Sequence, residues 1–222
     1  MTDIGDRRPL ESRNTRWAGT IARWLAARNI MPNQISQASM AAAAMAGGAF
    51  YWAGAASGWP RVSLLLLAAL CCQARLLCNL FDGMVAIEGG KGEPDGPFWN
   101  EFPDRVADLL IFVGLGYGIG MPDLGWAAGA FAVLTAYIRE LGRANGHRSV
   151  FSGPMAKQHR MATVTAATLA TLVEPLWDGH NQVLTIGLSV VAIGAAFTAF
   201  RRANTLIKCL KGARNVPDEI ER

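Results

Sequence analysis

Charged residues are scarce in this 222-residue sequence. Only 17% of its residues are Asp, Glu, Lys or Arg, and none of these lies within residues 29–60. Soluble domains usually contain about 25% charged residues, so the composition argues against an ordinary soluble protein. Tyrosine is rare as well, with three residues, and no stretch alternates basic and aromatic side chains. A nucleic-acid-binding protein is therefore disfavoured, although the net charge of +4 would suit an anionic membrane surface.

Cysteine is also rare, and its positions indicate no metal centre. Three of the four cysteines, Cys71, Cys72 and Cys78, lie in one apolar segment, and Cys209 lies far from them. This spacing matches no ligand pattern, so we interpret them as small apolar residues in a reduced or lipid-embedded environment. We expect no cleavable signal peptide, because residues 1–34 are polar and basic ahead of the first long apolar run.

Hydrophobic residues, in contrast, make up 51% of the sequence. Their runs predict an all-α, polytopic membrane protein with six transmembrane helices. The predicted spans are residues 35–57, 62–82, 103–121, 124–143, 154–173 and 182–200. By length alone, some of the uncharged runs would also suit buried helices of a soluble protein.

The distribution of charge between these spans predicts their orientation. If the spans alternate in direction, 19 of the 21 Lys and Arg residues fall on one side of the membrane. Arg61 lies on the other side, and Arg75 lies inside the second span. Because positively charged loops stay in the cytoplasm, we expect an inner-membrane protein with both termini and the polar stretch 79–108 in the cytoplasm.

The N-terminal residues 1–34 form a basic arm that contains six arginines. Within it, Trp17, Ile21 and Trp24 recur at helical spacing, which predicts an amphipathic helix in the plane of the membrane interface. A surface helix on a soluble core would give the same pattern. The expected organisation is a basic amphipathic arm at 1–34, a six-helix membrane domain at 35–206 and a polar cytoplasmic tail at 207–222.

The polar stretch 79–108 contains the side chains best suited to chemistry. On helices, Asn79 and Asp82 share one face at i and i+3, and Asn100 and Asp104 share another at i and i+4. Two helix ends that each present two oxygen-bearing side chains can converge on one hard cation. Helix capping or backbone hydrogen bonding by the same residues is the structural alternative.

The spacing of this stretch is N-x2-D-G-x2-A-I-x8-G-x3-N-x3-D. It resembles the signature of the CDP-alcohol phosphotransferase family, D-x2-D-G-x2-A-R-x8-G-x3-D-x3-D. Every gap length is the same. Asn79 and Asn100 stand where the family has its first and third Asp, and Ile87 stands where it has Arg.

The resemblance implies a membrane enzyme with a role for each matching residue. It implies that Asp104 is the general base and that the nucleotide contacts Asp82, Gly83, Ala86 and Gly96. It also implies a homodimer, and Mg²⁺ or Mn²⁺ held by Asn79, Asp82, Asn100 and Asp104. Because each Asn lacks the charge of an Asp, we expect one well-held ion rather than two.

Two further groups of cations are candidates for the site. Arg75 precedes Asn79 by four residues, so it either supplies a fixed catalytic charge near a diphosphate or forms a buried ion pair with Asp82 or Asp108. The second group, in residues 139–160, would suit a phosphate-bearing acceptor or would anchor the chain to lipid headgroups. Its members are Arg139, Arg143, Lys157 and Arg160. The loop loosely resembles the phosphatidylglycerophosphate synthase branch of the family.

Taken with the resemblance, these features indicate transfer of a phosphatidyl group from CDP-diacylglycerol to an alcohol, with release of CMP. The expected acceptor is phosphorylated, such as glycerol 3-phosphate or an inositol phosphate. The alternative is a non-catalytic membrane protein that binds lipid or nucleotide, for which Asn79, Asn100 and Ile87 would be the signs of a lost reaction. A transporter is disfavoured because the two halves of the sequence show no corresponding broken helices.

Overall fold

The computed structural model describes residues 15–147, 153–177 and 179–213, and these residues form helices and connecting turns without a strand. The all-α class is therefore confirmed. The helices are α1 (Arg16–Ala27), α2 (Pro32–Ala55), α3 (Gly58–Glu88), α4 (Gly96–Gly118), α5 (Pro122–Ala144), α6 (Lys157–Thr171), the short 3₁₀ helix η3 (Glu174–Trp177) and α7 (Gln182–Ala213).

Each of the six predicted apolar segments forms one long helix, but two boundaries around the polar stretch were wrong. Helix α3 continues past Asp82 to Glu88, and α4 begins at Gly96 rather than near Pro103. Pro97 lies in the first turn of α4, where a missing N–H costs nothing. Pro103 lies inside α4 without ending it. The eight residues of the signature therefore all lie on α3 and α4, as the helical spacing predicted.

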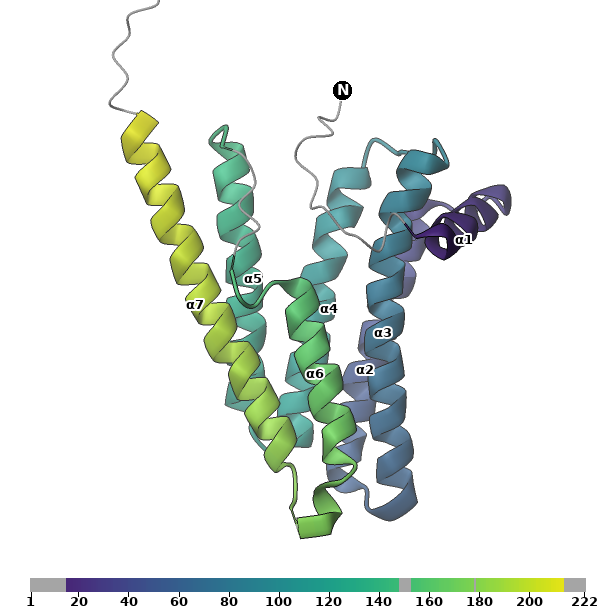
Figure 1. The fold of residues 1–222 in the computed structure, drawn as a ribbon, viewed down its shortest axis with the longest axis vertical. Coiled ribbons are helices and arrows are strands. Elements are labelled where there is room, and N and C mark those ends of the chain that lie inside the picture. The colour runs from purple at the N-terminus through teal and green to yellow at the C-terminus, as the bar shows by residue number, and fades with distance from the viewer. Residues whose placement is uncertain (1–14, 148–152, 178, 214–222) are drawn as a thin grey trace, which may run out of the picture.

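The six long helices pack as a closed ring around an apolar core (Figure 1). Helix α2 packs against α3 and α4, α4 against α5, and α5 against α7; α6 closes the ring between α7 and α3. Helix α6 has only 15 residues, whereas its neighbours α3 and α7 have 31 and 32. It consequently begins well below the upper ends of α3 and α5 in Figure 1.

Helices α2 and α4 touch backbone to backbone, because glycine lies at their contact points. A Cβ added to Gly47 would lie 2.2 Å from the carbonyl oxygen of Leu110, and one added to Gly118 would lie 2.1 Å from that of Phe50. Small residues are the usual means of close helix approach in membranes. This contact sets the position of α2 relative to α4. The upper end of α2 carries Ser36 and Ser39, and the upper part of α4 carries Asp104.

We expect Gly47→Ala to destabilise the fold, because the new methyl group meets backbone that cannot move aside. Overpacking of this kind costs about 1–3 kcal/mol. The matched control is Gly48→Ala, where the added Cβ meets nothing within 4 Å. Thermal unfolding in detergent should show a lower midpoint for the first variant only. Equal midpoints for the two variants would contradict the close contact.

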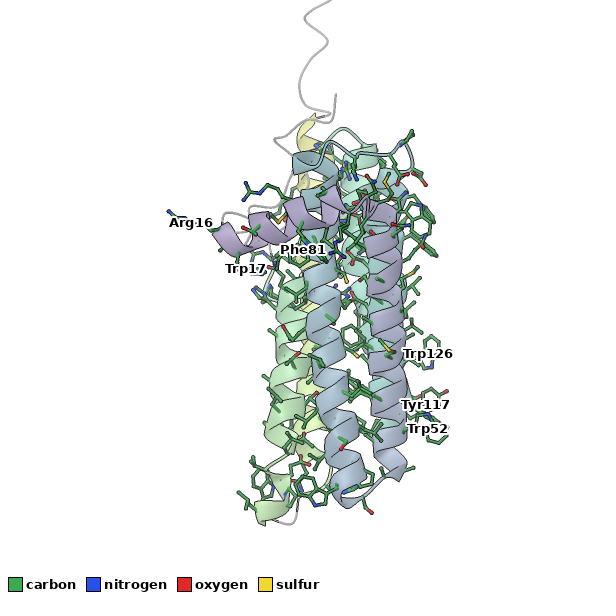
Figure 2. The ribbon with its side chains drawn as sticks, turned by 90° about the vertical axis from the view of Figure 1, so that its right-hand side faces the viewer. Arg16, Trp17, Trp52, Phe81, Tyr117 and Trp126 are labelled. Atoms are coloured by element: carbon green, nitrogen blue, oxygen red, sulfur yellow. The ribbon has the colours of Figure 1, made fainter. Side chains whose placement is uncertain are left out.

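Helix α1 crosses the upper end of the bundle at a steep angle to the other helices (Figure 2). Ala18 and Ala22 are buried against α3, and the Trp17 ring meets Phe81 edge-on at a centroid distance of 6.1 Å. Trp17 and Trp24 stay about half exposed, at 48% and 51%. One face of α1 thus packs on the bundle while its tryptophans point outward, as an interfacial helix requires.

Two helices are long and apolar enough to cross a membrane by length and composition, over Gly58–Ile87 and Gln182–Gly212. Helix α7 continues without a break past residue 206 to Ala213, beyond the predicted end of the membrane domain. The first part of the predicted arm, residues 1–14, and the end of the predicted tail, residues 214–222, lie outside the described residues.

Candidate functional site

The polar residues of the signature meet a lysine from α6, the neighbour of α3 in the ring. Asn79 and Asp82 lie near the end of α3, Asp104 lies in the third turn of α4, and Lys157 is the first residue of α6. Because α6 begins low in the ring, Lys157 reaches these residues below the upper end of the bundle (Figure 1).

Lys157 joins the two halves of the signature. Its Nζ donates to Asn79 Oδ1 at 2.5 Å and also forms a hydrogen-bonded ion pair with Asp104 Oδ2. It further interacts electrostatically with Asp82. Asp82 and Asp104 are only 6% and 5% exposed. Lys157 therefore bonds Asn79 of α3 and Asp104 of α4, and it lies near Asp82.

Helix α2 positions the α3 residues through two serines. Ser36 Oγ donates to Asp82 Oδ2 at 3.0 Å, while Asp82 Oδ1 accepts the Gly83 N–H at 2.6 Å. Ser39 Oγ accepts from Asn79 Nδ2 at 3.2 Å. The sequence analysis missed both serines. Their spacing of three residues at the start of an apolar helix was the available signal, since it puts them on one face.

A second ionic cluster lies beneath the first. Asp108 accepts from Arg75 Nη2 at 2.8 Å and from Arg160 Nη2 at 2.6 Å, and these side chains are at most 3% exposed. Arg75 Nη2 also approaches Asp104 Oδ1 at 3.5 Å. Of the two hypotheses for Arg75, the contacts match the buried ion pair with Asp108. Arg160, predicted to bind the acceptor, points its guanidinium at Asp108 instead.

Other predicted residues lie around this centre without joining it. Asn100 is exposed, and its amide nitrogen lies 3.5 Å from Glu101 Oε1 on the same helix. Gly83 and Ala86 are half-buried on α3. A Cβ added to Gly96 would meet nothing within 4 Å, so the space beside the start of α4 is open. Such space is what close approach of a ligand to backbone requires.

The two predicted acceptor residues on α5 are ion-paired. Arg139 binds Glu101 of α4 and Glu140, the latter at 2.9 Å, and Arg143 binds Glu140 at 3.1 Å. Each of the four predicted acceptor-binding cations therefore has a carboxylate partner.

A cavity of about 220 Å³ lies between the upper parts of α5 and α7. It is lined by Ile138, Arg139, Gly142, His147, Arg202, Leu206 and Cys209. The sequence analysis counted Arg202 only among the cytoplasmic charges. Its Nη1 donates to the Thr135 carbonyl at 2.8 Å, which fixes the guanidinium inside the ring. Two arginines from different helices at one cavity would suit an anionic group.

The side chains of the upper cluster fit one hard divalent cation. Asp82 and Asp104 offer carboxylate oxygens and Asn79 an amide oxygen, the donors that Mg²⁺ and Mn²⁺ prefer. Within the described residues, no group of three His, Cys, Asp or Glu side chains is arranged to hold a metal. Asp82 and Asp104 contribute the two negative charges of this donor set.

Comparison with known proteins agrees with this geometry at the level of fold. Neither protein-family models nor curated proteins give a match. A crystal structure of the phosphatidylinositol phosphate synthase of Mycobacterium tuberculosis with CDP-DAG bound superposes with a TM-score of 0.70 and 20% identity, over 94% of this chain and 98% of that one. The same synthase with manganese and citrate gives 0.70 and 19%, over 92% of each chain. Its apo form gives 0.66 and 19%, over 91% of this chain and 99% of that one. The chain therefore has the fold of a CDP-alcohol phosphotransferase, as the sequence resemblance implies.

Proposed function

We propose that this protein is a membrane enzyme that transfers a phosphatidyl group from CDP-diacylglycerol to a phosphorylated alcohol and releases CMP. The observation that carries the proposal is the ion pair of Asp104 with Lys157, beside Asn79 and Asp82, at one end of the ring. The shared fold supports it, since the related synthase was crystallised with CDP-DAG and with manganese.

The distribution of polarity supports a membrane location. Ile186, Ile193 and Phe200 of α7 are 63%, 71% and 67% exposed, whereas Arg75 and Asp108 inside the ring are 0% and 1% exposed. A soluble protein buries its large aliphatic groups and solvates its charges. On another side of the ring, Trp52, Tyr117 and Trp126 also project outward (Figure 2). The pattern is that of a ring surrounded by lipid, with α2 to α7 as six spans.

From the charge asymmetry, we propose that the upper end of the ring faces the cytoplasm. We also propose the division of the chain into the arm 1–34, the membrane domain 35–206 and the cytoplasmic tail 207–222. In a variant whose native cysteines are replaced, a cysteine at Gly92 should resist a membrane-impermeant thiol reagent applied to intact cells. A cysteine at Ser57, exposed at the other end of the ring, should react. The reverse labelling pattern would contradict the orientation.

In the proposed reaction, Asp104 accepts the proton of the acceptor hydroxyl. Its carboxylate lies on a rigid helix, and Lys157 fixes one of its oxygens. Asp82 and Asp104 would hold the divalent ion, which when bound would neutralise the diphosphate and stabilise charge on the departing CMP. Asp82, Gly83, Ala86 and Gly96 border the open space in which we place the cytidine nucleotide.

We place the phosphate of the acceptor near Arg139 and the cavity that Arg139 shares with Arg202. Arg139 lines this cavity and also pairs with Glu101, which lies three residues before Asp104 on α4. Lys157 would complete this cationic side. Arg143 is exposed and pairs with Glu140, which suits contact with lipid headgroups as well as with the acceptor.

The reaction can be tested with purified protein in detergent. With CDP-diacylglycerol and Mg²⁺ or Mn²⁺, we expect CMP release when glycerol 3-phosphate or an inositol phosphate is added. Serine and free inositol, which lack phosphate, should give none. Release with serine or free inositol alone would contradict the phosphate preference. No release with any acceptor, together with retained CDP-diacylglycerol binding, would favour the non-catalytic alternative.

A further inference from the structure

Lys157 lies where a cation between α3 and α4 would bind. Its ammonium bridges Asn79 Oδ1, at 2.5 Å, and Asp104 Oδ2. These oxygens come from the first and last positions of the signature pattern, so any ion held by both side chains would compete with Lys157 for them. The Lys157 side chain as a whole is 26% exposed, and its ammonium bonds the buried Asp104.

Asn79 is held in the orientation that suits a lysine. Its Nδ2 donates to the Arg75 carbonyl at 2.9 Å and to Ser39 Oγ at 3.2 Å. The amide oxygen is thereby turned toward Lys157. An aspartate at this position would have no N–H to donate to the Arg75 carbonyl, and that buried oxygen would lose its side-chain donor. The amide and Lys157 therefore form a matched pair.

The local charge balance leads to the same result. Asp82 and Asp104 supply two negative charges, and Lys157 offsets one of them. Arg75 and Arg105 lie 3.5 and 4.0 Å from Asp104 and add positive potential at the site. One divalent ion therefore already leaves a positive excess that a diphosphate can balance. A second divalent ion would add two more positive charges to oxygens that Lys157 already occupies, and in a partly buried site such repulsion is poorly screened.

We propose that Lys157 is a built-in cation that takes the place of one of two divalent ions, so that this site binds a single ion. The inference rests on the proposed function for the nature of that ion. It replaces the hypothesis that Arg75 has this role. The Arg75 side chain is 0% exposed and is bonded to Asp108, so it lies beneath the ion site instead of in it.

The test is a count of bound Mn²⁺ by electron paramagnetic resonance, on purified full-length protein without substrate. We expect one ion for the native protein. Combining Asn79→Asp with Lys157→Met restores a carboxylate and removes the ammonium, so this double variant should bind two. Lys157→Met alone should bind Mn²⁺ roughly tenfold more tightly, because a nearby positive charge is lost. Lys208→Met, an exposed lysine on α7, is the matched control and should behave like the native protein.

Two tightly bound ions in the native protein would overturn the inference, and so would absence of Mn²⁺ binding. Unchanged Mn²⁺ affinity in Lys157→Met would also overturn it, and this outcome can be read even if the double variant does not fold. CMP release by the native protein is measured separately. Release of CMP with two bound ions would keep the proposed function and remove the inference. One bound ion without CMP release would keep the inference and contradict the proposed function.

Discussion

Replacing Asp104 by Asn should abolish CMP release while leaving the protein folded. Loss of a general base lowers turnover by about 10²–10⁴-fold. The amide keeps the shape of the carboxylate and an oxygen for Lys157, so the ring of helices should persist. CDP-diacylglycerol binding, measured by calorimetry, should be largely retained, because Asp82 and the open space beside Gly96 are unchanged. Turnover is measured as CMP release under saturating donor and acceptor.

The control for this variant is Asp123→Asn, which changes an exposed aspartate at the start of α5. It should release CMP at the native rate. Near-normal CMP release by Asp104→Asn would show that Asp104 is not the base. Asp108 could not then replace it in this structure, because each of its two oxygens accepts from a buried arginine.

Replacing Asp108 by Asn should have the largest effect on stability of any single change in the ionic clusters. Arg75 and Arg160 are both buried, and Asp108 is their shared partner at 2.8 and 2.6 Å. Removing one partner of a buried pair typically costs about 3–5 kcal/mol, because the other charge stays uncompensated. For a chain of this size, the thermal unfolding midpoint should fall by roughly 6–20 °C.

A double variant separates the ion pair from other effects of the change. With Arg160→Met, only one buried guanidinium depends on Asp108, so the further loss caused by Asp108→Asn should be smaller than in the native background. Asp123→Asn again serves as the exposed control. If the midpoint of Asp108→Asn lies within about 1 °C of the native value, Arg75 and Arg160 do not depend on Asp108.

The sequence determined the class of the fold and the number of long helices. Apolar runs separated by polar residues depend on local composition, and each of the six runs forms a helix in the structure. The spacing of the signature also predicted which of its residues share a helix face, because residues at i, i+3 and i+4 share a face on any helix. Asp82 and Asp104 could therefore be chosen as partners before their helices were placed. Helix ends were less certain, as α3 and α4 show, because Pro103 is tolerated inside a helix.

Tertiary structure alone decided which cation belongs to which carboxylate. From sequence, Arg75 and Lys157 were both basic residues near the signature, and Arg160 resembled Lys157 in every local respect. Helix α6 begins low in the ring, so Lys157 meets Asn79 and Asp104, whereas Arg160, almost one turn further along, meets Asp108. The partner of a long, flexible cationic side chain depends on the depth and rotation of helices far apart in sequence. These are set by the packing of the whole ring, including the glycine contact between α2 and α4, and no local pattern encodes them.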